Sequence, residues 1–270
     1  MTAGRVVATT TSVLLWAAAF IVPQAPCMQN RSVTLDQILQ RLEQNLQEYD
    51  SKIPSFFCDE HLVSEMFPGR RQDITFADSI FRVKRVENPD HSTSLAESRE
   101  LKGFGAPSSS DFEGPAMIEG AFEGGLAVVS ASQQACMEYD LEKPKHGTYV
   151  IRFKTRDDPP RPADCLLQEK AHGQVSVDAV SMQITRLELI TPHHTIGGGQ
   201  HPWYRPMKGE WVVTAEYAPV TLDGKKFWMP ANISSRVTSD PNTFHSTTWL
   251  FKASYRNFHK LEVTSRVVPQ

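Results

Sequence analysis

The chain is dominated by runs in which apolar and polar residues alternate. The clearest case is the stretch 209–237, where apolar side chains take every second position on both sides of Asp223-Gly224. A period of two is typical of β-strands with one face buried and the other largely in water. Asp-Gly between two such runs predicts a tight hairpin, because both turn positions need a positive φ.

Similar runs predict strands along most of the chain, with short connections. We expect them at 56–66, 73–76, 79–86, 92–102, 126–139, 148–154, 173–178, 183–190, 247–256 and 260–267. We predict about ten strands in all, and their short connections favour one large antiparallel sheet. The predicted fold class is mainly β (α+β).

One helix is predicted, over Thr34 to Tyr49. Its apolar residues fall on a single stripe at helical spacing. Thr34 and Gln37 have the spacing of a capping box, and the residue before Pro54 disfavours further helix. A helix with one apolar stripe must lie on something, so we expect it to pack on one face of the sheet.

Two stretches lack periodicity and are rich in glycine, 103–120 and 191–208. We predict that both are loops at one rim of the sheet, over an apolar opening, because covers that must open are built from such segments.

Composition describes an ordinary globular chain. Of its 270 residues, 40% are hydrophobic and 22% are charged, which is enough for a sizeable core. The formal net charge of −3 argues against nucleic acid and against anionic membrane surfaces as partners.

The first 27 residues are predicted to be a signal peptide, which leaves 28–270 as a single domain. Arg5 provides the positive charge, and the apolar run from Val6 to Val22 precedes Pro23. Cleavage after Cys27 would put small residues at the −3 and −1 positions. A lipid anchor on Cys27 is less favoured, and a retained membrane anchor is less favoured again, because the run is short for a span. We therefore expect a periplasmic or secreted protein.

Export makes a disulfide permissible. Three cysteines follow the predicted signal, and they allow one intramolecular bridge. We predict Cys136–Cys165, which join the end of one run to the loop after the next, and a buried, inert Cys58.

No catalytic site is predicted. The sequence contains none of the common hydrolase, metalloprotease or nucleotide-binding motifs. His193, His194 and His201 are interpreted as solvated loop residues, so no metal or cofactor is expected. The run Asp59-Glu60-His61 and the residue Arg99 are interpreted as surface polarity.

The chain resembles the lipoprotein-carrier superfamily, the LolA/LolB-like proteins. An export signal, one amphipathic helix and a long antiparallel sheet follow that plan. Two passages are similar to outer-membrane lipoprotein-sorting relatives: GQVSVDAVSMQITRLELI, and VTAEYAPVTLDGKKFWMPANI with its Tyr217, Asp223-Gly224 and Phe227 to Pro230. The resemblance implies a curved sheet forming an unclosed barrel, whose hydrophobic cavity receives acyl chains.

The predicted function is an exported, non-catalytic binding or carrier protein for an apolar small molecule or a lipid acyl chain. The ligand would lie on the concave face of the sheet. The candidate ligand-binding residues are Trp211, Val213, Tyr217, Phe227, Met229, Trp249, Phe251 and Tyr255. The alternative is an interaction or sensor module of the same fold that binds another envelope protein, with these side chains forming a filled core.

Overall fold

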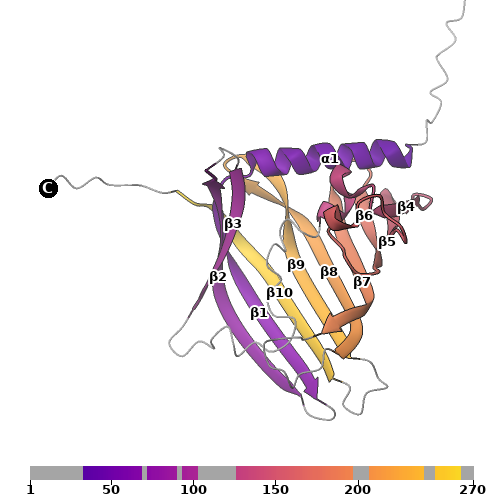
Figure 1. Ribbon diagram of the computed structural model, residues 1–270. Helices are drawn as coiled ribbons and strands as arrows, with labels where there is room; N and C mark the ends of the chain where they lie inside the picture. Colours follow the sequence, from indigo (N-terminus) through magenta and orange to yellow (C-terminus); the bar gives the residue numbers. More distant parts are fainter. Residues whose placement is uncertain are drawn as a thin grey trace, which may run out of the picture. The chain divides into compact units, whose positions relative to one another are not determined.

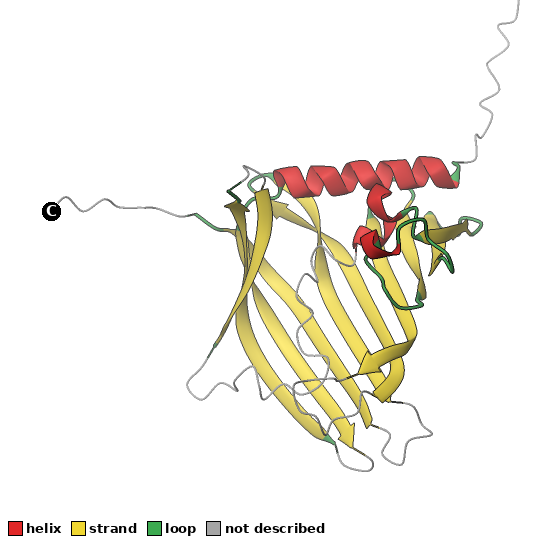
Figure 2. Cartoon of the chain, viewed as in Figure 1, coloured by secondary structure: helices red, strands yellow, loops and turns green. Residues whose placement is uncertain are grey.

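In the computed structural model, the described residues are 33–68, 72–89, 93–102, 126–196, 207–239 and 247–262. The predicted signal peptide, the stretch 103–120 and His201 lie outside them. Within the described ranges the fold is one antiparallel sheet of ten strands in the order β3-β2-β1-β10-β9-β8-β7-β6-β5-β4, with one α-helix N-terminal to it (Figures 1 and 2). The predicted fold class and the single unclosed sheet are confirmed.

The strands are β1 (Phe56–Pro68), β2 (Asp73–Glu87), β3 (Thr93–Leu101), β4 (Met137–Leu141), β5 (Thr148–Thr155), β6 (His172–Asp178), β7 (Ile184–Ile196), β8 (Met207–Leu222), β9 (Lys225–Ser239) and β10 (Thr247–Lys260). Every strand but those at the two edges pairs with two antiparallel neighbours, and the sheet is unclosed because β3 and β4 do not pair with each other. The β8–β9 hairpin turns at Asp223 and Gly224, with φ of 52° and 74°. Its predicted turn is confirmed.

The helix α1 (Leu35–Lys52) begins with the predicted capping box. The Thr34 hydroxyl accepts from the Gln37 N–H at 3.3 Å, and the Thr34 N–H donates to the Gln37 side chain at 3.0 Å. Two amides of the first turn that have no partner inside the helix are thereby satisfied.

The buried stripe of α1 joins the same core as the sheet. Ile38, Leu39, Leu42 and Tyr49 belong to it. Asn45 donates to the carbonyl of Met182 in the β6–β7 turn at 2.5 Å, and Arg85 of β2 donates to the Ile53 carbonyl after the helix. The helix therefore crosses the end of the sheet where β1 begins and where the β6–β7 and β8–β9 turns lie, as Figure 1 shows.

Three sequence predictions need correction. The runs 73–76 and 79–86 are one strand, β2. The run 126–139 is two 3₁₀ turns, η2 (Leu126–Val129) and η3 (Ala131–Gln133), followed by β4. The Ser130 N–H donates to the Ala127 carbonyl in that segment, as in a helical turn. A short apolar run fits a helical turn as well as a strand, so the sequence pattern could not distinguish the two. Lastly, β10 is continuous to Lys260, whereas 260–267 was predicted as a separate strand.

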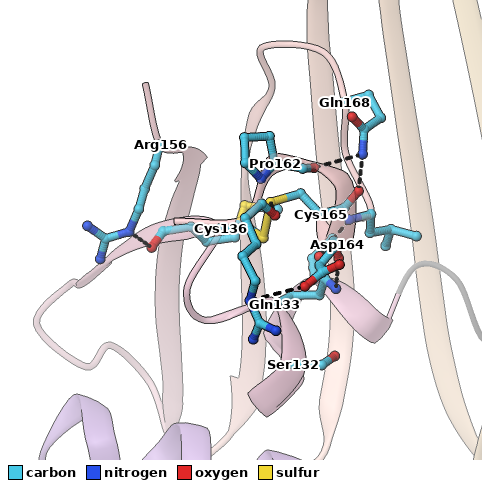
Figure 3. Close-up of a disulfide and its surroundings, with 12 residues drawn as sticks. Ser132, Gln133, Cys136, Arg156, Pro162, Asp164, Cys165 and Gln168 are labelled. Carbon is cyan, nitrogen blue, oxygen red and sulfur yellow. Dashed lines mark hydrogen bonds and ion pairs between the residues drawn. A yellow bond between two sulfur atoms is a disulfide. The ribbon is translucent and has the colours of Figure 1, made fainter. Parts of the chain in front are cut away.

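Two cysteines lie at disulfide distance, as predicted. The sulfur atoms of Cys136 and Cys165 are 2.14 Å apart and their Cα atoms 5.7 Å, and the bond joins the start of β4 to the turn η4 (Pro162–Asp164) (Figure 3). Gln133 bridges the same two segments by accepting from the Leu166 N–H at 2.7 Å. Cys58 is buried and free, also as predicted, and burial raises the pKa of its thiol far above the ordinary value.

Candidate functional site

The candidate site is the inner face of the sheet, which we define as the face bearing Leu62, Ala215, Ile233 and Ala253. These four residues come from β1, β8, β9 and β10, and all are buried. The register places them in one row, with Leu62 opposite Ala253, Ala253 opposite Ile233, and Ile233 opposite Ala215. Side chains directly opposite on antiparallel strands share a face, so this row fixes which side is apolar.

The predicted ligand-binding residues divide by burial. Tyr217, Phe227, Met229, Phe251 and Tyr255 are buried in the core. Val213, Trp211 and Trp249 are partly exposed.

The two tryptophans lie in one row of the inner face. Trp211 of β8 and Trp249 of β10 are both opposite Val237 of β9, so one strand separates them. Their strands, β8 and β10, are therefore not direct neighbours. Trp249 lies eleven residues before Lys260, the helix end of β10. At about 3.3 Å per residue that is roughly 35 Å from the end that α1 crosses.

The helix covers only part of this face. An α-helix with its side chains is about 10–12 Å across, so α1 cannot reach the row of Trp211 and Trp249. The inner face thus carries large apolar side chains well beyond the helix.

A small cavity lies beneath α1. Its volume is about 30 Å³, and its lining includes Leu46, Tyr217 and Trp228. The Tyr217 hydroxyl is buried without a hydrogen-bond partner among the described residues. Burial raises the pKa of Tyr217 well above the ordinary value. This space suits a water molecule and is far too small for an acyl chain.

Charged side chains occur on the inner face, where the sequence predicted surface polarity. Glu60 is 1% exposed. It accepts from the Ser79 hydroxyl at 2.5 Å and, through both carboxylate oxygens, from Arg99 Nε at 3.0 Å. The Arg99 guanidinium also lies 4.7 Å over the ring of Phe81.

The surroundings shift the pKa values of Arg99 and of the nearby Tyr255. Burial works to lower the pKa of Arg99, but the Glu60 carboxylate outweighs it, and the pKa is raised above its ordinary value. The pKa of Tyr255 is also raised, first by burial and then by the nearby carboxylate. The result is an ion pair inside the apolar face, in which the Glu60 carboxylate is buried and the Arg99 guanidinium is partly buried.

The pattern contained a signal for this cluster. Glu60 has the same phase as Phe56, Cys58 and Leu62, all of which are completely buried. The interpretation as surface polarity is therefore wrong for Glu60, because consecutive strand residues face opposite sides and Glu60 faces the apolar side.

A second polar group lies beside Trp211. The indole N–H of Trp211 donates to the Ser235 hydroxyl at 2.7 Å. The ring centroids of Trp211 and His194 are 4.6 Å apart. His194 in turn contacts Glu169 at 2.6 Å. The prediction of a solvated loop residue is thus wrong for His194, which lies in β7. Across the described ranges, no group of three or more His, Cys, Asp or Glu could hold a metal ion.

The predicted rim loops are only partly described. Residues 191–196 belong to β7 and 207–208 to β8, so the loop prediction is wrong for every described residue of the second stretch. The position of the loops over an opening stays a prediction.

No protein-family model matches the chain, and no curated protein matches it. Among solved structures, the chain is similar to a LolA superfamily protein from Nitrosomonas europaea, at 9% identity and a TM-score of 0.30, over 84% of this chain and 94% of that one. It is also similar to a protein domain from Vibrio parahaemolyticus named for outer membrane lipoprotein sorting, at 11% identity and a TM-score of 0.37, over 81% and 90% of the two chains. Both structures carry names from the family that the sequence resembles. With TM-scores below 0.5, these structures carry no information on what this chain binds. Its ligand must therefore be inferred from its own residues.

Proposed function

We propose that this protein is an exported, non-catalytic binding or carrier protein that holds a lipid acyl chain or another apolar small molecule on the inner face of its sheet. The observation that carries the proposal is the apolar row of Trp211, Val237 and Trp249, which lies beyond the reach of α1. Large apolar side chains that no helix covers are the usual lining of a small-molecule site.

Two further features support the proposal that the protein is exported. The apolar run before Pro23 has the form of a signal peptide, with residues 28–270 as the exported domain. The Cys136–Cys165 pair is typical of oxidising compartments, which include the periplasm and the extracellular space. Along the described part of the chain, no helix is long and apolar enough to cross a membrane.

The test uses a fluorescent fatty acid as probe. We expect the purified protein to bind it, and we expect Trp249→Asp to abolish binding because a carboxylate would stand in the apolar row. Leu250→Asp is the matched control. It changes the next residue of β10, which faces the other side of the sheet, and should bind the probe as the wild type does.

Two results would contradict the proposed lipid site. If the wild type does not bind the probe, or if both variants bind equally well with their folds retained, the inner face is not a lipid site.

The alternative function is an interaction or sensor module that binds another envelope protein. The burial of Phe251 and Tyr255 favours it, since both behave as core residues. Mass spectrometry of lipids that co-purify with the protein separates the two. A carrier retains a lipid in stoichiometric amount, whereas a filled module retains none.

A further inference from the structure

The outer face of the sheet, opposite to the inner face, carries two hollows that the proposed function does not use. One has a volume of about 430 Å³ and the other about 530 Å³, and both are lined by His61 and Ser254. Both volumes fall in the range of small-molecule sites.

The first hollow follows from the strand register. One row runs from Val63 through Lys252 and Ser234 to Thr214. The next runs from Asp78 through His61, Ser254, Asn232 and Glu216 to Arg186. In the second row the short Ser254 and Asn232 stand between longer side chains on both sides, so the surface sinks over β9 and β10.

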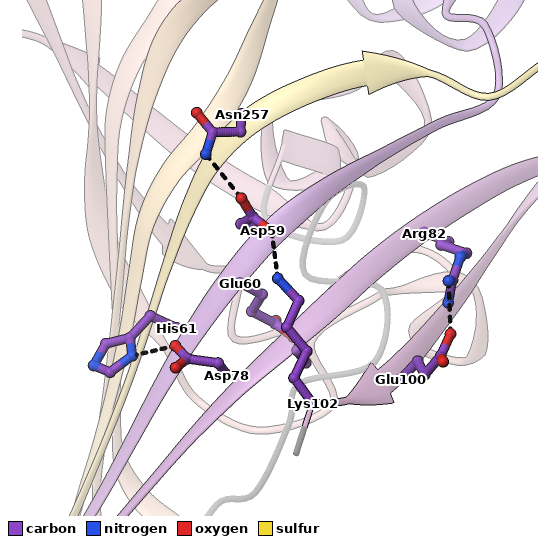
Figure 4. A network of polar contacts seen from close by, with 9 residues as sticks. Asp59, Glu60, His61, Asp78, Arg82, Glu100, Lys102 and Asn257 are labelled. Carbon is purple, nitrogen blue, oxygen red and sulfur yellow. Dashed lines mark hydrogen bonds and ion pairs between the residues drawn. The ribbon is translucent and has the colours of Figure 1, made fainter.

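Contacts between side chains hold the long residues in place. His61 Nδ1 lies 2.8 Å from Asp78, and Figure 4 shows the two pointing toward each other from β1 and β2. At the other end Arg186 donates to Glu216 at 2.9 Å. The walls are thus arranged before any ligand arrives, which lowers the entropic cost of binding.

Most charged side chains of the walls are paired, whereas Arg256, which also lines the second hollow, has no ion pair among the described residues. Arg186 is paired with Glu216, and Lys252 lies 3.3 Å from Glu65. In the second hollow Lys102 is paired with Asp59, which also accepts from Asn257. An ionic ligand would have to compete with these pairs, so the groove favours a neutral one.

The floor is polar and adaptable. Ser234, Ser254 and Thr214 present hydroxyls, each of which can donate and accept a hydrogen bond. A ligand rich in hydroxyl groups matches such a floor, whereas an acyl chain would leave the floor without partners.

An exposed aromatic ring stands at the edge of the groove. Phe76 of β2 is 57% exposed and is opposite Val63, which lines the first hollow. Its ring is stacked on His61 with centroids 6.4 Å apart. A flat apolar surface beside hydroxyls and amides suits a sugar ring, which has both an apolar C–H face and polar edges.

From these observations we infer that the outer groove formed by the two hollows binds a neutral oligosaccharide. Because the hollows share His61 and Ser254, they lie next to each other, and a ligand of several sugar units would reach both. The inference is independent of the proposed lipid site, which lies on the other face.

The experiment is isothermal titration calorimetry of the full protein with four neutral tetrasaccharides: cellotetraose, maltotetraose, mannotetraose and tetra-N-acetylchitotetraose. We expect at least one to bind with a dissociation constant of about 1 mM or tighter. Phe76→Ser removes the aromatic surface, and Ser254→Phe fills the floor that the two hollows share. Each should weaken binding by about tenfold or more.

The matched control is Val86→Ser. Val86 lies on the outer side of the same strand as Phe76 and is 40% exposed, but it is ten residues further along β2, roughly 33 Å from the ring at the edge of the groove. It should leave affinity unchanged. Circular dichroism verifies each fold, and if Ser254→Phe does not fold, Phe76→Ser against Val86→Ser decides. No binding by any tetrasaccharide overturns the inference, as does binding that Phe76→Ser leaves intact or that Val86→Ser weakens equally.

Discussion

At the scale of single residues, the buried pair of Glu60 and Arg99 is the most consequential feature of the inner face. A buried ion pair contributes little net stability, since desolvation offsets the attraction. Removing one partner is different, because the remaining charge stays buried without compensation. The pair therefore constrains the sequence strongly while stabilising the fold only weakly.

We expect Glu60→Ala to lower the free energy of unfolding by about 3–5 kcal/mol, because the Arg99 guanidinium loses its carboxylate. The double variant Glu60→Leu with Arg99→Met should lose clearly less, because it buries no charge. Urea unfolding followed by tryptophan fluorescence measures both. Asp59→Ala is the control, since its exposed pair with Lys102 is worth less than about 1 kcal/mol. A Glu60→Ala variant as stable as Asp59→Ala would contradict the assignment.

Two tyrosines provide a second test at this scale. The Tyr217 hydroxyl has no partner among the described residues, whereas the Tyr139 hydroxyl donates to the Val128 carbonyl at 2.6 Å. Tyr217→Phe should therefore not lower the free energy of unfolding, while Tyr139→Phe should lower it by about 1 kcal/mol. Thermal unfolding of the two variants compares them directly. Equal losses would show that Tyr217 has a partner, such as a water in the cavity beneath α1.

At the scale of elements, the sequence predicted long periodic segments well and short apolar ones poorly. The helix and the β8–β9 hairpin were found because each combines a sustained period with an end signal, the capping box or Asp-Gly. The strand prediction for 126–139 was wrong because the apolar run from Leu126 to Val129 fits a 3₁₀ turn as well as it fits a strand. Which faces share a core, and hence the site, depends on register across strands distant in sequence.

The segment before β6 is fastened to β7 by Glu169. Its carboxylate contacts His194 and accepts from the Thr195 N–H at 3.0 Å. Burial works to raise the pKa of Glu169, but these hydrogen bonds outweigh it and leave the pKa lowered. A carboxyl whose pKa is lower in the folded state stabilises the fold above its unfolded pKa, and that contribution is lost as the pH falls through the folded value.

We therefore expect Glu169→Gln to be less stable than the wild type at pH 7, with a difference that shrinks as the pH falls through about 4 and below. Urea unfolding across pH 7 to 3 measures it. Asp36→Asn, a change in the first turn of α1, serves as a control for general charge effects. A Glu169→Gln difference that stays constant with pH would mean that the carboxylate charge plays no part in the contact.

At the scale of the whole molecule, the disulfide relates the stability of the fold to the oxidising compartment that the proposed export would provide. The bond between Cys136 and Cys165 spans 29 residues and ties β4, an edge strand of five residues, to the turn after β5 (Figure 3). In the chain-entropy model, closing such a loop stabilises the fold by roughly 3–4 kcal/mol. Among the strands β4 pairs with β5 alone, so the disulfide adds a covalent tie at this edge of the sheet.

We expect reduction to lower the free energy of unfolding by roughly that 3–4 kcal/mol. Unfolding with and without dithiothreitol measures it, and the Cys136→Ala, Cys165→Ala double variant is the control, because the reductant should no longer affect it. Thiol labelling provides an independent readout. Cys58 should label only after unfolding, since it is buried and its pKa is raised, and the other two only after reduction. If reduction left stability unchanged, β4 would be held by its pairing with β5 alone, and the disulfide would no longer support export to an oxidising compartment.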